Sequence, residues 1–480
     1  MKHNKRTKIV CTLGPASETK EIITGMVKAG MNVARLNFSH GTHANHKKLI
    51  STVRAVEKET GEPIAILQDL QGPKIRIGII PKEGIELKEE SVAMFDTALE
   101  GYTDGVIPIH YDLHKFVKKG ERLLINDGRS EVVVLGVSGT TIRTEVVVGG
   151  IITSNKGINI PDTELVVSAL TEKDKKDARF GVEHGVDMMA LSFVMNAKDI
   201  LDLRFVIKEY EKELGIRGKE PIRIIAKIER NEAVNNIVEI LGVVDGIMVA
   251  RGDLGIEVPV ADVPLIQKKL IDLSLEAAKP VIVATQMLDS MQNNPRPTRA
   301  EVSDVSGAVV DHTDAVMLSN ESATGKYPVK TVKTMANIIS ETEKSSYDDL
   351  AFREPKKNKD GVDDVISGLS RYIGEKVGAK LILAASISGE TGRLISRYRP
   401  ELPVIVVTNT PRVQHQLNLS WGIHPLIIKP CRTIEELIER SVTELKKRNM
   451  VKSGESIIVV AGEPVGQAGH VNLLEVKDVE

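Results

Sequence analysis

The feature that most constrains the fold is a regular alternation of short apolar runs with longer segments of helical character. The apolar runs are rich in β-branched residues, as strands buried on both faces of a sheet are. The segments between them carry helix signals; residues 17–29, for example, start at Ser17 and stop before Gly30. Strands that alternate with helices in this way predict an α/β fold built on a (β/α)8 TIM barrel. The predicted barrel strands span residues 8–13, 33–38, 64–69, 188–193, 222–228, 246–250, 281–285 and 315–318.

Two regions depart from this rhythm. Between residues 73 and 159 the helical pattern gives way to short β segments with Gly and Pro turns, which predicts an inserted β-barrel lid. A polar tract at 345–361 then leads to strands near 381–385, 404–408, 425–428 and 456–461, typical of a separate C-terminal α/β domain. The length of 480 residues also favours about three domains. We therefore expect an A domain (1–72 and 160–344), a B domain (73–159) and a C domain (345–480).

The composition excludes several classes of function. Basic and acidic residues nearly balance, 64 against 66, so nothing suggests binding to nucleic acid or to a membrane surface. No apolar run approaches the roughly 18 residues of a membrane span, and none follows the basic N-terminus as in a signal peptide. The two cysteines, Cys11 and Cys431, have no metal-binding spacing, which favours a reducing, cytoplasmic setting.

Polar residues gather where the predicted barrel strands end, which is where active sites of this fold lie. Lys227 and Glu229 are two residues apart in one strand, so their side chains point to the same side. Ionised groups inside a sheet are costly unless they are paired or bind a metal. Asp253 follows the next strand, and the sequence therefore predicts a divalent ion, Mg2+ or Mn2+, held by Glu229 and Asp253 beside the Lys227 ammonium. Further polar residues at strand ends are Arg35, Asn37, Asp69, Ser192, Thr285 and Ser319.

The chain has none of the common phosphate-binding signatures. It contains neither G-x-x-x-x-G-K-[ST] nor the H-R-D and D-F-G motifs of protein kinases. If a nucleotide binds, cationic side chains and a metal ion must hold its phosphates; the candidates are Arg35, Arg76, Lys156 and Lys227.

Seven segments, in this order, resemble the pyruvate kinase family: CTLGPAS (11–17), RLNFSHG (35–41), QGPKIR (71–76), NKGINIP (155–161), AKIE (226–229), VARGDLG (249–255) and ATQML (284–288). The resemblance covers the whole chain. It implies an A-domain barrel, a B-domain lid, a regulatory C domain and a homotetramer. It also implies the conversion of phosphoenolpyruvate and ADP to pyruvate and ATP.

The resemblance also implies roles for individual residues. Lys227, Arg76 and Thr285 are expected to be catalytic: Lys227 stabilises negative charge, Arg76 neutralises phosphoryl oxygens, and Thr285 helps to deliver a proton through water. The expected substrate contacts are Arg35, Lys227, Gly252, Asp253 and Thr285. The expected ATP contacts are Asn37, Phe38, Ser39, His40, Arg76 and Lys156.

One departure from the family pattern concerns the monovalent cation. Family members that require K+ carry a threonine after the aspartate that matches Asp69, and a glutamate after the Gly-Pro pair. Here these positions are Leu70 and Lys74. We expect the Lys74 ammonium to replace the monovalent ion among Asn37, Ser39 and Asp69, so that K+ is not required. The alternative is that Lys74 points into solvent.

Residues 386–392 resemble the phosphate loop that binds effectors in the C domain of the family, with Ser386, Ser388, Gly389 and Thr391 as candidate contacts. Glu390 stands where some relatives have a basic residue, which favours a sugar monophosphate or a nucleotide over fructose 1,6-bisphosphate. An ordinary strand-to-helix turn without a ligand is the alternative.

Other classes of function remain open at this stage. A strand-end lysine could form a Schiff base, so Lys227 is also compatible with a class I aldolase acting on a pyruvate-like substrate. Lys227 and Glu229 could form a purely structural ion pair. A catalytically inactive sensor with an effector-binding C domain is the third alternative.

Overall fold

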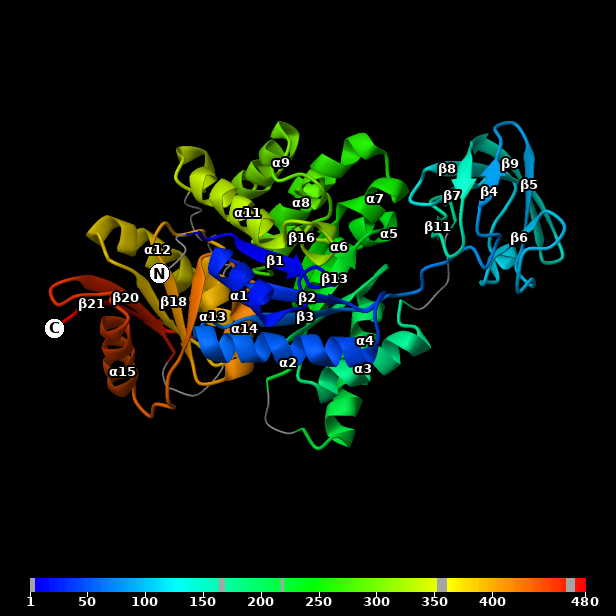
Figure 1. Cartoon of the computed structure of the whole chain (residues 1–480). Helices are drawn as coiled ribbons and strands as arrows, with labels where there is room; N and C mark the ends of the chain where they lie inside the picture. The colour runs from blue at the N-terminus through cyan, green and yellow to red at the C-terminus, as the bar shows by residue number, and fades with distance from the viewer. Residues whose placement is uncertain (1–4, 164–168, 217–219, 352–360, 463–470) are drawn as a thin grey trace.

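The computed structural model describes residues 5–163, 169–216, 220–351, 361–462 and 471–480. Figure 1 shows a barrel at the centre, an all-β unit beyond one side of it and a smaller α/β unit on the opposite side. None of the helices in the described residues combines the length and apolarity that crossing a bilayer requires.

The predicted (β/α)8 barrel is confirmed. Its strands are hydrogen-bonded in the closed order β1-β16-β15-β14-β13-β12-β3-β2, and every pair is parallel. All their C-terminal ends therefore lie at one face of the barrel. The strands are β1 (Lys8–Thr12), β2 (Val33–Asn37), β3 (Ala65–Asp69), β12 (Met188–Leu191), β13 (Arg223–Ile228), β14 (Gly246–Ala250), β15 (Val281–Ala284) and β16 (Ala315–Leu318).

Two apolar layers hold the barrel together, because alternate strand residues face inward and outward. Val10, Ile225 and Met248 belong to the cluster that fills the interior, whereas their neighbours Ile9, Ile224 and others pack outward against the helices. The helices are α1 (Lys20–Ala29), α2 (His43–Thr60), α3 (Glu172–Glu183), α4 (Ala197–Glu213), α5 (Asn231–Asn235), α6 (Ile237–Val243), α7 (Arg251–Glu257), α8 (Val263–Glu276), α9 (Arg299–Val310), α10 (Asn320–Ala323) and α11 (Pro328–Thr342).

The helix starts follow their capping residues, with one correction. Helix α3 begins with a full capping box, in which Thr171 and Asp174 satisfy each other's backbone N–H. The first helix, however, is capped by Thr19 and begins at Lys20 rather than at Ser17. Ser17 instead accepts a hydrogen bond from the Gly14 N–H at 3.1 Å, so its oxygen serves the preceding loop.

The insertion after β3 contains a six-stranded mixed sheet in the order β11-β7-β8-β9-β5-β6 and a two-stranded sheet of β10 and β4. Both sheets share one apolar core, which includes Ile77, Phe95 and Ile142. The strands are β4 (Ile85–Leu87), β5 (Val92–Asp96), β6 (Val106–Pro108), β7 (Arg122–Ile125), β8 (Ser130–Ser138), β9 (Thr141–Val148), β10 (Gly150–Ile152) and β11 (Ile158–Asn159).

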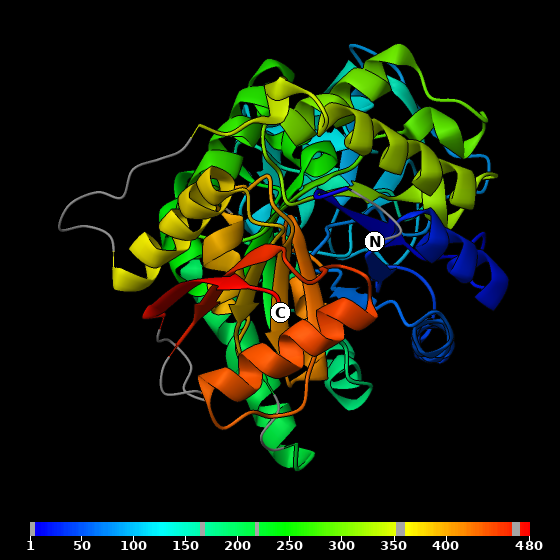
Figure 2. The same cartoon turned by 90° about the vertical axis from the view of Figure 1, so that its left-hand side faces the viewer.

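The C-terminal unit is a five-stranded sheet in the order β19-β18-β17-β20-β21, in which only β21 runs antiparallel. The sequence did not predict β21, whose residues are mostly half-buried and alternate weakly. Figure 2 shows α15 lying across this sheet. Its elements are α12 (Val362–Val377), β17 (Ile382–Ala385), α13 (Glu390–Ser396), β18 (Val404–Thr408), α14 (Pro411–Leu417), β19 (Ile423–Ile427), α15 (Ile434–Lys447), β20 (Ser456–Ala461) and β21 (Leu473–Asp478).

The tract predicted to be a polar linker, residues 345–361, contains a buried residue in its described part. Residues 352–360 lie outside the described part of the chain. In the described part, Asp348 is buried and its Oδ2 accepts a hydrogen bond from Arg6 at 2.8 Å. This pair ties the end of the barrel unit to the chain's N-terminal segment.

Candidate active site

The Lys227 side chain lies at the centre of the polar cluster at the C-terminal face of the barrel. Its Nζ is 2.8 Å from Glu229 Oε1 and 3.4 Å from Asp69 Oδ1, and it donates to Ser192 Oγ at 2.7 Å. Only 12% of the side chain is exposed. Burial alone would lower the pKa of Lys227, but the charges of Asp69 and Glu229 outweigh burial and raise it. Lys227 is therefore a fixed cation.

Arg35 forms the second cationic corner of the cluster. Its Nε and Nη2 each lie 2.7 Å from Asp69 Oδ2, and its Nη1 donates to Thr12 Oγ1 at 2.7 Å. Burial by itself would raise the pKa of Asp69, but Lys227 and Arg35 together lower it below its usual value. Asp69 is thus an ionised anchor that fixes two cations at neighbouring strand ends.

Glu229 and Asp253 provide the acidic side of the cluster. Glu229 is 1% exposed, and its Oε2 accepts the Phe193 N–H at 2.7 Å. The pKa of Glu229 is raised, first by burial and further by the charge of Asp253, although Lys227 opposes both. A buried carboxylate such as Glu229, with a second carboxylate acting on it, is suited to a shared cation.

The residues fit a magnesium-type ion, which is commonly bound by one or two carboxylates and completed by substrate oxygens and water. Within the residues that the structure describes, no group of three or more His, Cys, Asp and Glu side chains is placed to hold one ion. Glu229 and Asp253 are therefore candidate ligands for a site of the open type, in which the protein supplies only two carboxylates.

Thr285 and Gly252 meet at the end of β15. The Gly252 N–H donates to Thr285 Oγ1 at 2.9 Å, and Thr285 Oγ1 donates to the Ala284 carbonyl at 2.6 Å. Thr285 has a φ of 72° and the next residue, Gln286, has a φ of 54°, conformations that non-glycine residues rarely adopt. This strained turn directs the Thr285 hydroxyl toward the first turn of α7, which carries Asp253.

Arg251 holds this turn in place, and the sequence analysis did not identify it as a functional residue. Its guanidinium binds both carboxylate oxygens of Asp304, at 2.6 and 2.7 Å, and donates to the Thr285 carbonyl at 2.8 Å. The position follows directly from the chain, because Arg251 begins α7 immediately after β14. The bonding partner Asp304, 53 residues away, could not be identified from sequence.

The same chain matches two domain models over most of its length. Residues 4–332 match the model described as "Pyruvate kinase, barrel domain", and residues 364–477 match "Pyruvate kinase, alpha/beta domain". The chain belongs to the pyruvate kinase family. It is therefore an enzyme, and its resemblance to that family is confirmed.

Similar proteins that are named pyruvate kinase match nearly the whole of this chain. The chain is 43% identical to the pyruvate kinase of Sporosarcina psychrophila, with 98% of this chain and 80% of that protein covered. It is 43% identical to the pyruvate kinase of Clostridium acetobutylicum, with 99% and 100% covered. With the pyruvate kinase of Mycobacterium tuberculosis it shares 41% identity over 98% of each chain.

The structure does not bring every expected ligand contact to the Lys227 cluster. Arg76 lies in the insertion, where its Nη1 donates to the Asn155 carbonyl at 2.9 Å. Lys156, in the same segment, is partly buried and its carbonyl accepts the Ile77 N–H at 2.9 Å. In Figure 1 the body of the insertion extends away from the barrel, and no contact of the Arg76 or Lys156 side chain with the Lys227 cluster is found among the described residues.

Lys74 lies in a different place from the one expected. Its Nζ is 3.5 Å from Asp253 Oδ1 and 3.8 Å from Asp127 Oδ1 in the insertion. Asp69, its expected neighbour, instead forms ion pairs with Arg35 and Lys227. The lysine is 23% exposed, so it does not simply point into solvent. The structure thus places the Lys74 ammonium beside a candidate metal ligand.

The remaining expected ATP contacts form the loop after β2. Asn37 Oδ1 accepts the Ser39 N–H at 3.1 Å, and the His40 carbonyl contacts His46 Nε2 at 2.9 Å. Lys173, which the sequence analysis did not single out, donates to the Phe38 carbonyl at 2.7 Å. The loop is therefore fixed from behind by α2 and α3.

The candidate effector loop lies against the barrel. The Ser388 carbonyl accepts hydrogen bonds from Arg223 at 3.1 Å and from Arg393 at 3.4 Å. Gly389 has a φ of 79°, and Thr391 is buried. Ser386, at the end of β17, donates its N–H to the Val407 carbonyl at 3.1 Å.

The aldolase alternative is not favoured. A Schiff-base lysine must lose its proton to attack a carbonyl, and such lysines have a lowered pKa. Here the surrounding carboxylates raise the pKa of Lys227. Family membership points the same way.

Proposed function

We propose that the chain transfers the phosphoryl group of phosphoenolpyruvate to ADP and so produces pyruvate and ATP. The observation that carries this proposal is the Lys227 ammonium, held between Asp69 and Glu229 at 3.4 and 2.8 Å at the mouth of the barrel. A permanent cation at this point would stabilise the charge that develops on the transferring phosphoryl group and on the enolate that remains.

The other residues of the cluster have complementary tasks in the proposed reaction. Arg35, oriented by Asp69, would bind phosphoryl oxygens. Glu229 and Asp253 would hold Mg2+ or Mn2+, which when bound would offset the negative charge of the substrate. The Gly252 and Asp253 segment would lie beside the substrate carboxylate. Thr285 would then relay a proton from water to the enolate carbon, because a threonine hydroxyl is too weak an acid alone.

ADP binding would involve the loop after β2 and the insertion. Asn37, Phe38, Ser39 and His40 lie on the barrel side. Arg76 and Lys156 would arrive when the B domain, residues 73–159, moves over the barrel mouth. Catalysis would therefore need lid closure, which also excludes water from the phosphoryl group.

A coupled assay tests the proposed reaction. Phosphoenolpyruvate, ADP and Mg2+ are supplied together with lactate dehydrogenase and NADH, and pyruvate formation is followed as loss of NADH absorbance. We expect turnover only when all three are present. Absence of turnover under these conditions would contradict the proposal, and a pyruvate adduct trapped by borohydride would support the aldolase instead.

We also propose that K+ is not required, because Leu70 lacks the side-chain oxygen of K+-dependent relatives and the Lys74 ammonium, although 3.5 Å from Asp253 rather than beside Asp69, adds a cation at the same barrel mouth. The assay is repeated with tetramethylammonium as the only monovalent cation, and we expect near-full activity. The Lys74→Glu variant is expected to lose activity in tetramethylammonium and to regain part of it in K+. Loss of nearly all wild-type activity without K+ would refute this proposal.

Regulation by a phosphorylated effector is proposed at Ser386, Ser388, Gly389 and Thr391. Two nearby cations support it, because Arg223 and Arg393 both donate hydrogen bonds to the Ser388 carbonyl, at 3.1 and 3.4 Å. Arg223 begins β13, the strand that carries Lys227 near its other end, so a ligand there would act on the active site through one strand. We further propose a cytoplasmic homotetramer; light scattering of the purified protein tests the assembly.

A further inference from the structure

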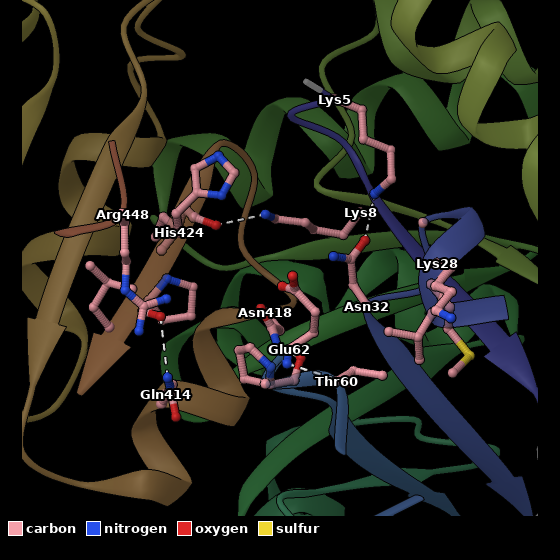
Figure 3. Close-up of a pocket in the computed structure, with 18 of the residues that line it drawn as sticks. Lys5, Lys8, Lys28, Asn32, Thr60, Glu62, Gln414, Asn418, His424 and Arg448 are labelled. Carbon is pink, nitrogen blue, oxygen red and sulfur yellow. Dashed lines mark hydrogen bonds between the residues drawn. The ribbon is translucent and has the colours of Figure 1, made fainter. Parts of the chain in front are cut away.

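A lysine that donates to a backbone carbonyl fixes one part of the chain to another. Lys8, at the start of β1, provides one such contact: it donates to the Ile423 carbonyl at 2.7 Å, beside a cavity of about 550 Å³ between the barrel and the C-terminal unit (Figure 3). Lys8 is only 3% exposed, so this contact belongs to the packing of the two units. Lys173, on α3, provides another at the opposite end of the barrel, where its Nζ donates to the Phe38 carbonyl at 2.7 Å. Lys173 thus reaches the loop that follows β2.

Phe38 is the fixed point of this loop, residues 37–40. Its N–H donates to the Asp69 carbonyl at 2.9 Å, and its carbonyl accepts the Lys173 ammonium. Its side chain is buried, and its ring centre lies 3.9 Å from that of His46 with only 11° between the ring planes. The other three residues of the loop are half-buried or exposed. Their position therefore depends on the anchor at Phe38.

Asp177 determines where the Lys173 ammonium lies. Its Oδ2 is 2.6 Å from Lys173 Nζ, and its Oδ1 is 2.6 Å from Nε2 of His43 at the start of α2. Asp177 is buried, and its backbone carbonyl accepts a hydrogen bond from Gln68 on β3 at 2.7 Å. Asp177 therefore connects α3 to α2, to β3 and, through Lys173, to the loop after β2.

The folding of the barrel does not explain this arrangement. The side chain of Lys173 is 50% exposed, and an ion pair exposed to this extent contributes little to the free energy of folding. A hydrogen bond from a charged donor is, however, short and directional. The contact with the Phe38 carbonyl therefore fixes the geometry of the loop more than it stabilises the molecule.

We propose that Lys173 and Asp177 are positioning residues for the nucleotide. This inference rests on the proposed function, in which residues 37–40 contact ADP. Lys173 holds the Phe38 carbonyl and Asp177 holds Lys173, so the loop has its binding shape before ADP arrives. A loop that is already ordered loses less conformational entropy when a ligand binds. The pair therefore sets the affinity for ADP, whereas phosphoenolpyruvate and the chemical step depend on the Lys227 cluster.

The first test is the Lys173→Met variant in the coupled assay, with ADP and phosphoenolpyruvate varied in turn. We expect KM for ADP to rise about tenfold, because one hydrogen bond from a charged donor is lost. The value of kcat and KM for phosphoenolpyruvate should change by less than about twofold. Lys173→Arg retains a charged donor and should restore KM for ADP to near the wild-type value. An unchanged KM for ADP in Lys173→Met would overturn the proposal.

Lys176→Met is the matched control for charge. Lys176 is exposed on the same helix, so its replacement removes an equal charge close to the loop. We expect KM for ADP to stay at the wild-type value in this variant. An equal rise of KM in Lys176→Met and Lys173→Met would assign the effect to the overall charge of α3 and contradict a role for the Phe38 contact.

Asp177→Asn distinguishes positioning from a direct contact between Lys173 and the nucleotide. The amide fills the same space but releases the ammonium from its ion pair. If Lys173 bound the phosphates itself, this release would leave KM for ADP unchanged or lower it, and the proposal would be wrong. We expect KM for ADP to rise instead. The double variant with Lys173→Met should be no worse than Lys173→Met alone, because both changes act through one carbonyl.

The wild-type protein separates this inference from the proposed function. If it forms no pyruvate from phosphoenolpyruvate and ADP, the proposed function itself fails. If it does so and Lys173→Met shows the same dependence on ADP, only the positioning role fails. Thermal unfolding is measured for every variant. A variant in which kcat and both KM values worsen together would show a merely structural contact, and this result would also overturn the proposal.

Discussion

At the scale of single residues, the charge of Lys227 has two separable consequences. The ammonium neutralises Asp69 and Glu229, which are 2% and 1% exposed, and it is also the cation that the proposed chemistry requires. Removing one partner from a buried ionic cluster leaves the others uncompensated, which typically costs about 3 kcal/mol of stability. A variant at this position therefore has to be measured for folding as well as for turnover.

We predict that Lys227→Met lowers kcat by about 10³-fold, because a preorganised charge facing the reacting atoms is lost. The coupled assay measures this loss, and thermal unfolding measures the accompanying destabilisation. Lys176→Met, which removes an exposed lysine of α3, should change neither quantity. A folded Lys227→Met protein with wild-type kcat would show that Lys227 has no charge-stabilising role.

The residues that the sequence identified and those that it missed differ in a physical respect. Lys227, Glu229 and Asp69 were identifiable because a charge at the end of an apolar strand stands out locally. The position of Lys74 was not predictable in the same way, because its partners Asp253 and Asp127 come from α7 and from the insertion. The long side chain of Lys74 can reach several acidic groups, and only the tertiary fold determines which of them lies nearest.

At the scale of the elements, the turn after β3 joins the barrel to the insertion. Gly72 has a φ of 70°, and a Cβ atom there would lie 2.9 Å from Phe193 Cδ2 and 3.0 Å from Ser192 Cβ. Ser192 accepts a hydrogen bond from Lys227, and the backbone N–H of Phe193 binds Glu229. The close approach of this turn therefore supports the active-site cluster from behind.

We predict that Gly72→Ala destabilises the protein by about 2 to 3 kcal/mol, from a positive φ together with a steric clash. It should also lower kcat, because Ser192 and Phe193 must move. Gly61→Ala is a matched control: Gly61 also has a φ of 70°, but nothing lies within 4 Å of the added Cβ. The control should cost only about 1 kcal/mol and leave kcat unchanged. Equal effects of the two substitutions in unfolding and activity measurements would contradict the clash.

The prediction of helices and strands was correct where the pattern of apolar residues is strong, and it missed a strand whose burial depends on the tertiary fold. The barrel strands were found because they are apolar throughout, as their burial on both faces requires. The strand β21 was missed because it lies at the sheet edge, where Leu473–Asp478 are exposed or half-buried and mix Glu, Lys and Asp with apolar residues. Edge strands lack the burial that produces a clear pattern.

At the scale of the whole molecule, a charged network joins the C-terminal unit to the barrel. His415, on α14, is 2.9 Å from Asp187 through Nδ1 and 2.5 Å from Glu57 through Nε2. Arg54, on α2, also pairs with both carboxylates, at 2.6 and 2.9 Å. His415 is separated from these acids by 228 and 358 residues, so no local pattern could have revealed the network.

This network makes the stability of the molecule depend on pH with a definite sign. Burial alone would lower the pKa of His415, but the hydrogen bonds to Asp187 and Glu57 raise it from 6.5 to about 9. The folded state therefore keeps a proton that the unfolded state loses above pH 6.5. The stabilisation is complete below pH 6.5 and is lost as the pH rises toward 9, by roughly 3 kcal/mol at most. The pKa values of Asp187 and Glu57 are lowered, so their own contribution is lost only in acid.

We predict that the thermal midpoint of the wild-type protein falls more steeply between pH 6.5 and 9 than that of His415→Gln, which has no titrating ring. The comparison must be a difference between the two proteins, because Lys5 and Lys8 have lowered pKa values and contribute with the opposite sign. His114→Gln, a histidine replacement in the insertion, should keep the wild-type slope. If the thermal midpoints of the wild type and of His415→Gln fall with pH at the same slope, the imidazolium does not hold the two units together. The interface would then depend on the ion pair of Arg399 and Asp314, which lie 3.0 Å apart.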